Sequence, residues 1–386
     1  MKALFGSLFE KRENQISFLD GLRALAIIMV VASHSRNDFV FAGGIEKPST
    51  IFAGVDYLWT GVDLFFVLSG FLIGKILFQE IKKTGSIELG SFLLKRGFRI
   101  WPLYFFVCLV SLLRLAFIGQ LPGFSTIAPD LLFLTNYFPE HLAFGSWSLS
   151  IEEQFYILAS SAVFLTRKWG SQSGEKIALF LVSLLIIAPI SRFLTWRVYS
   201  TTGMSEFDIE WNIIHSFITT HYDGIVIGLL LAAFEVFTDV CAPLRKHFSR
   251  LLIVSLLFLG FLVFLKPLVF TYSFASVLFG STLWYGLHHR MSKITSLLSW
   301  PVFQVISRLS YGMYLWYRFP LWRIARFVMT YFKNVPPLAQ YLMIFGIAFV
   351  TAVLCASITY VLIEQPFLAM RSRLFQRREQ LAYAPS

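Results

Sequence analysis

About ten apolar runs, each near the length that crosses a lipid bilayer, follow one another along this chain. A transmembrane helix needs about 20 mainly apolar residues. Hydrophobic residues make up 56% of the sequence and charged residues only 14%, whereas soluble domains carry about 25% charged residues. The pattern predicts an all-α, polytopic integral membrane bundle with about ten transmembrane helices. The runs lie at residues 17–34, 57–78, 100–118, 148–165, 177–198, 213–234, 251–265, 268–287, 309–331 and 338–363.

The runs occupy nearly the whole sequence, so one membrane-embedded domain is expected at residues 17–367. Residues 1–16 are expected to form a cytoplasmic N-terminal segment, and residues 368–386 a basic cytoplasmic tail. The first run lacks the small-residue cleavage site of a signal peptide, so we expect it to remain as a helix. The sequence shows no internal repeat and no fused soluble domain.

The net charge of +11 is carried by short basic clusters between the apolar runs. Such clusters are typical of the cytoplasmic loops of membrane proteins. Most of the 33 Lys and Arg residues fall in segments expected on the same side of the membrane as the N-terminus. The long loops expected on the other side, at residues 119–147 and 200–212, contain no Lys or Arg. This distribution predicts a multi-pass protein of the cytoplasmic (inner) membrane with both termini in the cytoplasm. It argues against nucleic acid as a partner.

The first run contains two ionisable side chains, Arg23 and His34. They are eleven positions apart, which on a helix places them on one face and about 16 Å apart along the axis. Ionisable groups within a span are costly and usually functional, and imidazole titrates near the pH that proton transfer requires. Both are candidate catalytic residues. The simpler alternative is an arginine that reaches the membrane interface and a histidine that ends the helix.

The second run places a carboxylate, Asp63, among apolar residues. A buried carboxylate requires a partner, and arginine or histidine is the obvious one, so Asp63 is a further candidate. Ser69 and Gly70 in the same run are small residues of the kind that let transmembrane helices approach closely. For these two we predict a packing role.

A basic cluster that contains Arg96 and Arg99 precedes the third run. Two arginines three positions apart lie on one side of a helix and form a fork suited to phosphate oxygens. They are therefore candidates for binding a phosphate-rich ligand from the cytoplasm. An ordinary cytoplasmic anchoring cluster is the alternative.

The fourth run carries two adjacent carboxylates, Glu152 and Glu153. Adjacent helix positions point about 100° apart, so at least one of the two should face the interior of the bundle. Glu152 shares a face with Ser148 and Tyr156, and this polar stripe is suited to orienting a hydroxyl substrate or a histidine. The alternative is a helix start at the interface, where the helix dipole favours glutamate.

These segments together resemble motifs of the acyltransferase-3 family, the bacterial membrane O-acyltransferases that modify surface polysaccharides and some small molecules. The sequence departs from the usual pattern at two places. Tyr317 and Arg318 follow Trp316 where a His-Trp-Pro type sequence is common, and Gln365 stands where a basic residue is common. The matching blocks stand in family order at residues 18–23 with His34, 61–73, 96–104, 146–156, 309–316 and 363–367.

The resemblance implies a membrane-bound O-acyltransferase that takes an acyl group, most often acetyl, from acyl-CoA. The acyl group would pass to a hydroxyl of a carbohydrate or a lipid-linked glycan in or across the bilayer. His34 would act as general base or carry the acyl group briefly. The other implied roles are donor binding by Arg23, Arg96, Arg99 and Tyr104, orientation of His34 or of the acceptor by Asp63 and Glu152, and acceptor binding by Trp147, Ser148, Glu153 and Tyr156.

Two other functions fit the sequence. A transporter also places charges inside the membrane, but it should show an internal repeat with broken helices in corresponding places. A catalytically inactive partner of the same fold is the second, and the altered Tyr317 and Arg318 positions leave this alternative open. No metal cofactor is expected, because no His, Cys, Asp or Glu residues have the spacing of a metal site.

Overall fold

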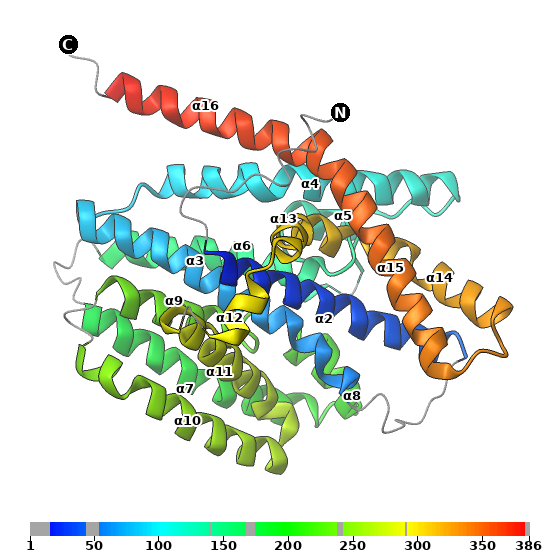
Figure 1. Ribbon diagram of the computed structural model, residues 1–386, viewed down its shortest axis with the longest axis horizontal. Helices are drawn as coiled ribbons and strands as arrows, with labels where there is room; N and C mark the ends of the chain where they lie inside the picture. Colours follow the sequence, from blue (N-terminus) through cyan, green and yellow to red (C-terminus); the bar gives the residue numbers. More distant parts are fainter. Residues whose placement is uncertain are drawn as a thin grey trace.

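The computed structural model describes residues 16–43, 54–138, 140–166, 174–237, 242–289 and 292–382, and this part of the chain contains helices and no strand. The expected N-terminal segment, residues 1–16, lies outside the described residues except for Ile16. Figure 1 shows the helices packed into one bundle, with α7, α9, α10 and α11 grouped at one end and α14 and α15 at the other. An all-α fold is therefore confirmed.

Six helical segments of the described chain are long and apolar enough to cross a membrane. Their number is smaller than the ten expected, although helices also form at other predicted runs, including α6 (Ser146–Thr166) and α10 (Ala242–Leu265). The six are α2 (Ser17–Phe41), η1 with α3 (Val55–Thr60 and Gly61–Thr84), α4 (Leu89–Phe117), α7 (Gly174–Tyr199), α11 (Pro267–His288), and α15 (Pro337–Thr359) with its continuation.

Two of the predicted runs are broken, so the expectation of single helices there is wrong. The run at residues 213–234 divides into a π-helical turn (Ile209–Ile214), a polar loop, and α9 (Asp223–Val236). Side chains of the loop hydrogen-bond its own backbone. The Thr220 hydroxyl donates to the Ile214 carbonyl oxygen at 2.8 Å, and the His221 imidazole Nδ1 lies 2.7 Å from the His215 carbonyl oxygen. Hydropathy does not reveal the break, because apolar residues flank it on both sides.

The run at residues 309–331 divides at Tyr317 into α13 (Pro301–Trp316) and α14 (Arg318–Tyr331). Pro320 lies in the first turn of α14. It has no N–H to donate to the carbonyl of Trp316, four positions earlier, so a continuous helix would lose a hydrogen bond there.

Helix α3 occupies the centre of the bundle: 72% of its most apolar window is buried inside the protein, compared with 22% for α7. It packs closely against α9 through glycines. A Cβ atom built on Gly70 would lie 2.1 Å from the Ile225 carbonyl oxygen, and one on Gly228 would lie 2.2 Å from the Val67 carbonyl oxygen. The packing role predicted for Gly70 is confirmed.

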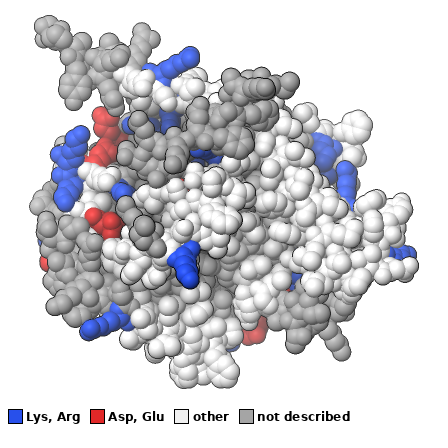
Figure 2. Space-filling view, in the orientation of Figure 1, with Lys and Arg blue, Asp and Glu red and all other residues white. Residues whose placement is uncertain are grey.

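The outer helices present large apolar side chains to their surroundings, as a bundle in lipid requires. Exposed examples are Leu113 on α4, Ile186 on α7, Leu257 on α10 and Leu354 on α15. Figure 2 shows a face that is mostly uncharged, with Lys and Arg mostly towards its edges. The bilayer is therefore the expected solvent of this surface.

The C-terminal tail, as far as the structure describes it (to Ala382), is helical and packs on the bundle. Helix α16 (Gln365–Ala382) follows α15 through a π-helical turn (Tyr360–Glu364) and lies along α4 (Figure 1). The Lys95 ammonium lies 4.7 Å from the centre of the Phe375 ring, a cation–π contact. The tail thus covers the end of α4 that carries the basic cluster.

Replacement of Gly228 by valine should destabilise the bundle by about 1–3 kcal/mol, because the added side chain overpacks the α3–α9 contact. The matched control is Gly346→Val on α15, where a built Cβ meets nothing within 4 Å. Thermal unfolding of the purified proteins in detergent would measure the difference. Equal midpoints for the two variants would contradict the close contact.

Candidate functional site

Three adjoining cavities run through the bundle. The basic cavity (Asp20, Arg23, Lys75, Arg99 and Arg308 among its residues) has a volume of about 340 Å³. The central cavity is the smallest at about 110 Å³ and shares Arg23 and Arg99 with the basic cavity. The aromatic cavity, of about 230 Å³, shares Val62 and Tyr314 with the central cavity. The central cavity therefore lies between the other two.

The basic cavity carries an excess of positive charge. Four cationic side chains, Arg23, Lys75, Arg99 and Arg308, line it together with a single carboxylate, Asp20. The Ser307 hydroxyl donates to Asp20 Oδ1 at 2.8 Å. Lys75 comes from α3 and Arg308 from α13, so residues far apart in the sequence supply this charge. A cavity of this composition is suited to an anion with several phosphate groups.

In the central cavity, three hydroxyl and carboxyl groups form a chain. The Tyr156 hydroxyl donates to Glu152 Oε2 at 2.5 Å and lies 2.6 Å from the Ser69 Oγ. Since the single phenol proton is given to Glu152, Ser69 must be the donor to Tyr156. Arg23 and Arg96 line the same cavity, so Glu152 has cationic side chains nearby.

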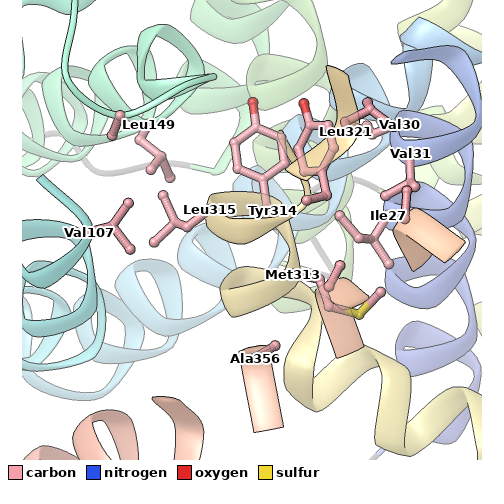
Figure 3. Packing of buried hydrophobic residues seen from close by; sticks show 14 of the residues in the cluster. Ile27, Val30, Val31, Val107, Leu149, Met313, Tyr314, Leu315, Leu321 and Ala356 are labelled. Atoms are coloured by element: carbon pink, nitrogen blue, oxygen red, sulfur yellow. The ribbon is translucent and has the colours of Figure 1, made fainter. Parts of the chain in front are cut away.

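Tyr314 forms the wall between the central and aromatic cavities. Its hydroxyl lies 2.6 Å from Ser148 Oγ and 3.1 Å from the Gly145 carbonyl oxygen. Gly145 has φ +75°, and a Cβ on it would lie 3.0 Å from the Tyr314 hydroxyl, so only glycine suits this position. Figure 3 shows Tyr314 among core residues that include Leu149 and Val30.

His34 lines the aromatic cavity, not a lipid-facing surface. Its Nδ1 lies 3.0 Å from the Val30 carbonyl oxygen one turn earlier, and its ring meets Tyr317 edge-on at 5.4 Å. Because a carbonyl oxygen only accepts hydrogen bonds, Nδ1 carries the proton and Nε2 keeps its lone pair. The helix itself therefore selects the tautomer with a basic Nε2.

A second imidazole, His215, lines the aromatic cavity. Its ring centre lies 4.3 Å from that of Trp147, 4.7 Å from Trp211 and 5.5 Å from Trp59, and all three indoles line the same cavity. These residues come from α6, the π-helical turn and η1, so the tertiary fold alone brings them together. The cavity thus combines imidazoles with broad aromatic faces.

Asp63 pairs with His221 and lines none of the three cavities. His221 Nε2 lies 2.9 Å from Asp63 Oδ1, both side chains are fully buried, and the ring stacks on Trp147 at 5.6 Å. The partner that Asp63 was expected to need is present, but it is His221 and not His34. Through His221, Asp63 therefore holds the loop before α9 in place.

A buried ion pair lies beside this pair. Arg192 donates from Nη1 and Nη2 to the two oxygens of Asp223 at 2.7 and 3.0 Å, and from Nε to the Val269 carbonyl oxygen at 2.6 Å. Ser273 donates to Asp223 Oδ2 at 2.5 Å. The bidentate pair joins α7, α9 and α11, and its charges are compensated within the bilayer.

Comparison with known proteins places this architecture in a family. The family model described as an acyltransferase domain matches residues 16–361, which include every cavity residue named above. The chain belongs to the acyltransferase-3 family. No solved structure matches it significantly.

Curated relatives of this acyltransferase-3 chain include proteins of Staphylococcus aureus. A protein of strain COL named "Putative O-acetyltransferase" is 26% identical over 398 residues, which cover 92% of this chain and 58% of the relative. A protein of strain NCTC 8325 named "O-acetyltransferase OatA" is 26% identical over 379 residues, which cover 90% and 56%. The chain thus spans a little over half the length of these relatives.

The acyltransferase-3 fold brings together most, but not all, of the predicted site residues. Tyr104 is fully buried, and its hydroxyl donates to Asp130 Oδ1 at 3.0 Å, so it belongs to the core. Glu153 accepts from the Trp101 indole N–H at 3.3 Å. Neither lines any of the three cavities described above. Those that line a cavity are Arg23, His34, Arg96, Arg99, Trp147, Ser148, Glu152 and Tyr156.

Several cavity residues were missed by sequence reasoning. From the sequence, Lys75 and Arg308 were interpreted as ordinary charged residues of cytoplasmic segments, and His215 as a histidine of a loop or helix end. Nothing local distinguishes them, because their significance depends on which helices meet. Arg318, one of the departures from the family pattern, lines the aromatic cavity, forms an ion pair with Asp38 and lies 5.3 Å from the Phe144 ring.

The buried ion pair should be essential for stability in this acyltransferase-3 protein. Arg192→Met leaves the Asp223 carboxylate uncompensated within the bundle, which should destabilise it by about 3–5 kcal/mol. Arg197→Met removes an exposed arginine from the same helix and should have little effect. Thermal unfolding in detergent compares them, and a stable Arg192→Met protein would contradict the proposed importance of the pair.

Proposed function

We propose that the protein transfers an acetyl group from acetyl-CoA, bound at the basic cavity, to a carbohydrate hydroxyl in the aromatic cavity. The observation that carries the proposal is the series of three adjoining cavities, with Arg23 at one end of α2 and His34 in the last cavity. The family and the O-acetyltransferase names of the relatives support O-acyl transfer. Donor and acceptor are inferred from the charge and shape of the cavities.

The basic cavity suits the phosphates of coenzyme A. Arg23, Lys75, Arg99 and Arg308 supply four positive charges, and guanidinium and ammonium groups bind phosphate oxygens strongly. Arg23 and His34 lie about 16 Å apart along α2. This separation suits an extended pantetheine arm that runs through the central cavity. By the positive-inside rule, the basic cavity faces the cytoplasm.

His34 supplies the reactive nitrogen. Its Nδ1–H donates to the Val30 carbonyl oxygen, so Nε2 has the lone pair. Nε2 either takes the proton of the acceptor hydroxyl or attacks the thioester carbon itself. In both routes a bond to the acyl carbon forms, the C–S bond breaks, and coenzyme A leaves as its thiolate.

The aromatic cavity suits a carbohydrate acceptor. Trp59, Trp147 and Trp211 offer large apolar faces with N–H groups at their edges. A sugar ring has apolar faces bordered by hydroxyls, so it complements such a surface. A lipid-linked glycan would present its sugar to this cavity from the opposite side of the membrane to the donor.

His34→Gln should lower label transfer from [acetyl-¹⁴C]CoA to membrane glycans by about 10²–10⁴-fold, the usual contribution of an acid–base group, or abolish it. Membranes that contain the wild-type or variant protein, with their own glycans as acceptor, would be assayed for alkali-labile label. His289→Gln, an exposed histidine at the end of α11, is the matched control. Undiminished transfer by His34→Gln would remove His34 from the mechanism.

Lys75→Gln should raise the KM for acetyl-CoA about 10-fold and leave kcat nearly unchanged, because it removes one phosphate contact that is uniform along the reaction. Lys83→Gln, an exposed lysine in the last turn of the same helix, is the control. Initial rates at varied acetyl-CoA concentration provide the measurement. An unchanged KM for Lys75→Gln would place the donor phosphates elsewhere.

A further inference from the structure

The aromatic cavity contains an imidazole whose position nothing above explains. His215 is 7% exposed and lines the same cavity as His34, but it comes from the turn that precedes α9. We propose that His215 is a second catalytic imidazole, which removes the proton of the acceptor hydroxyl while His34 carries the acyl group. This inference rests on the proposed function and divides its chemistry between two residues.

A carrier role for His34 creates the need for a second base. Nδ1–H of His34 is occupied by the Val30 carbonyl, so Nε2 is its only basic nitrogen. When Nε2 attacks the thioester, the N–C bond forms, the C–S bond breaks, and the thiolate of coenzyme A leaves. The acylated ring then has no lone pair with which to accept a proton.

His215 completes the second step. The acceptor oxygen attacks the acyl carbon, its proton passes to the His215 imidazole, and the C–N bond to His34 breaks. The products are the ester, a neutral His34 with its Nδ1–H intact, and a protonated His215 that returns its proton to water in the cavity. Atoms and charges balance without a further reactant.

The surroundings of the two rings support this division. His34 lies against Tyr317, whose ring centre is 6.1 Å from that of Tyr314, the wall through which the donor arm would enter. His215 lies against Trp147 and Trp211, where the acceptor sugar would stack. His34 therefore packs against a tyrosine beside the proposed entry of the donor, and His215 packs among the indoles that we assign to the acceptor.

His221 and Asp63 are positioning residues for His215. His221 Nδ1 lies 2.7 Å from the His215 carbonyl oxygen, which only accepts, so this nitrogen carries a proton. On the other side of the ring, Nε2 lies 2.9 Å from Asp63 Oδ1. The carboxylate on central helix α3 thus fixes the backbone that presents His215 to the cavity.

The test measures two reactions of the same membranes: acetyl transfer to glycan, and acceptor-free exchange of label between acetyl-CoA and coenzyme A. Exchange is a signature of a covalent intermediate. His215→Gln should lower transfer about 10²–10⁴-fold and leave exchange within about twofold of wild type, whereas His34→Gln should lose both. His289→Gln should retain both.

Three results would overturn the inference. They are transfer by His215→Gln at the wild-type rate, loss of exchange in parallel with transfer, and absence of exchange in a wild-type protein that transfers normally. Absence of exchange alone leaves the proposed acetyl transfer intact. A wild-type protein that transfers no acetyl group from acetyl-CoA would instead refute the proposed function. If His215→Gln lowers the thermal midpoint, the His215→Ala variant is assayed in its place, with imidazole added to the membranes. Recovery of transfer on addition of imidazole supports the inference. A folded His215→Ala protein whose transfer does not recover overturns the inference.

Discussion

A charged side chain inside a bilayer must be compensated by a partner or must face water, and this constraint organises the interior of the protein. Arg192 and Asp223 compensate each other, as do Asp63 and His221. Arg23 and Glu152, in contrast, line the central cavity. The interior therefore contains closed pairs near α9 and, along α2, a set of polar groups around open space, for which we propose the function.

The glycine contact between α3 and α9 makes this separation possible. Because the two backbones approach within the reach of a single Cβ, Asp63 at the start of α3 meets His221 just before α9. The same approach places the loop before α9 against the aromatic cavity, where His215 joins residues from α2 and α6. A packing feature between small residues thus determines which polar groups meet.

The sequence was sufficient to predict the all-α membrane class, and that Arg23 and His34 share one helix. Apolar runs near 20 residues long report helices directly, and an Arg–His spacing of eleven defines a face without tertiary information. The runs at 213–234 and 309–331 were misjudged because hydropathy averages over the polar loop at residues 215–222 and over the break at Tyr317. Asp63 was correctly expected to have a partner, yet the identity of His221, 158 positions away, depended on helix packing. The burial of Tyr104 and its hydrogen bond to Asp130 could not be foreseen, because a motif tyrosine that packs and one that binds look alike in sequence. The catalytic and binding roles remain predictions.

The position of Tyr314 has a consequence for the proposed reaction. If acetyl-CoA binds at the basic cavity as we propose, its acyl group is the leading end of the donor and passes Tyr314 before it reaches His34. The phenol ring, held by a glycine carbonyl and a serine hydroxyl, would then border the path of the acyl group into the cavity that holds both imidazoles.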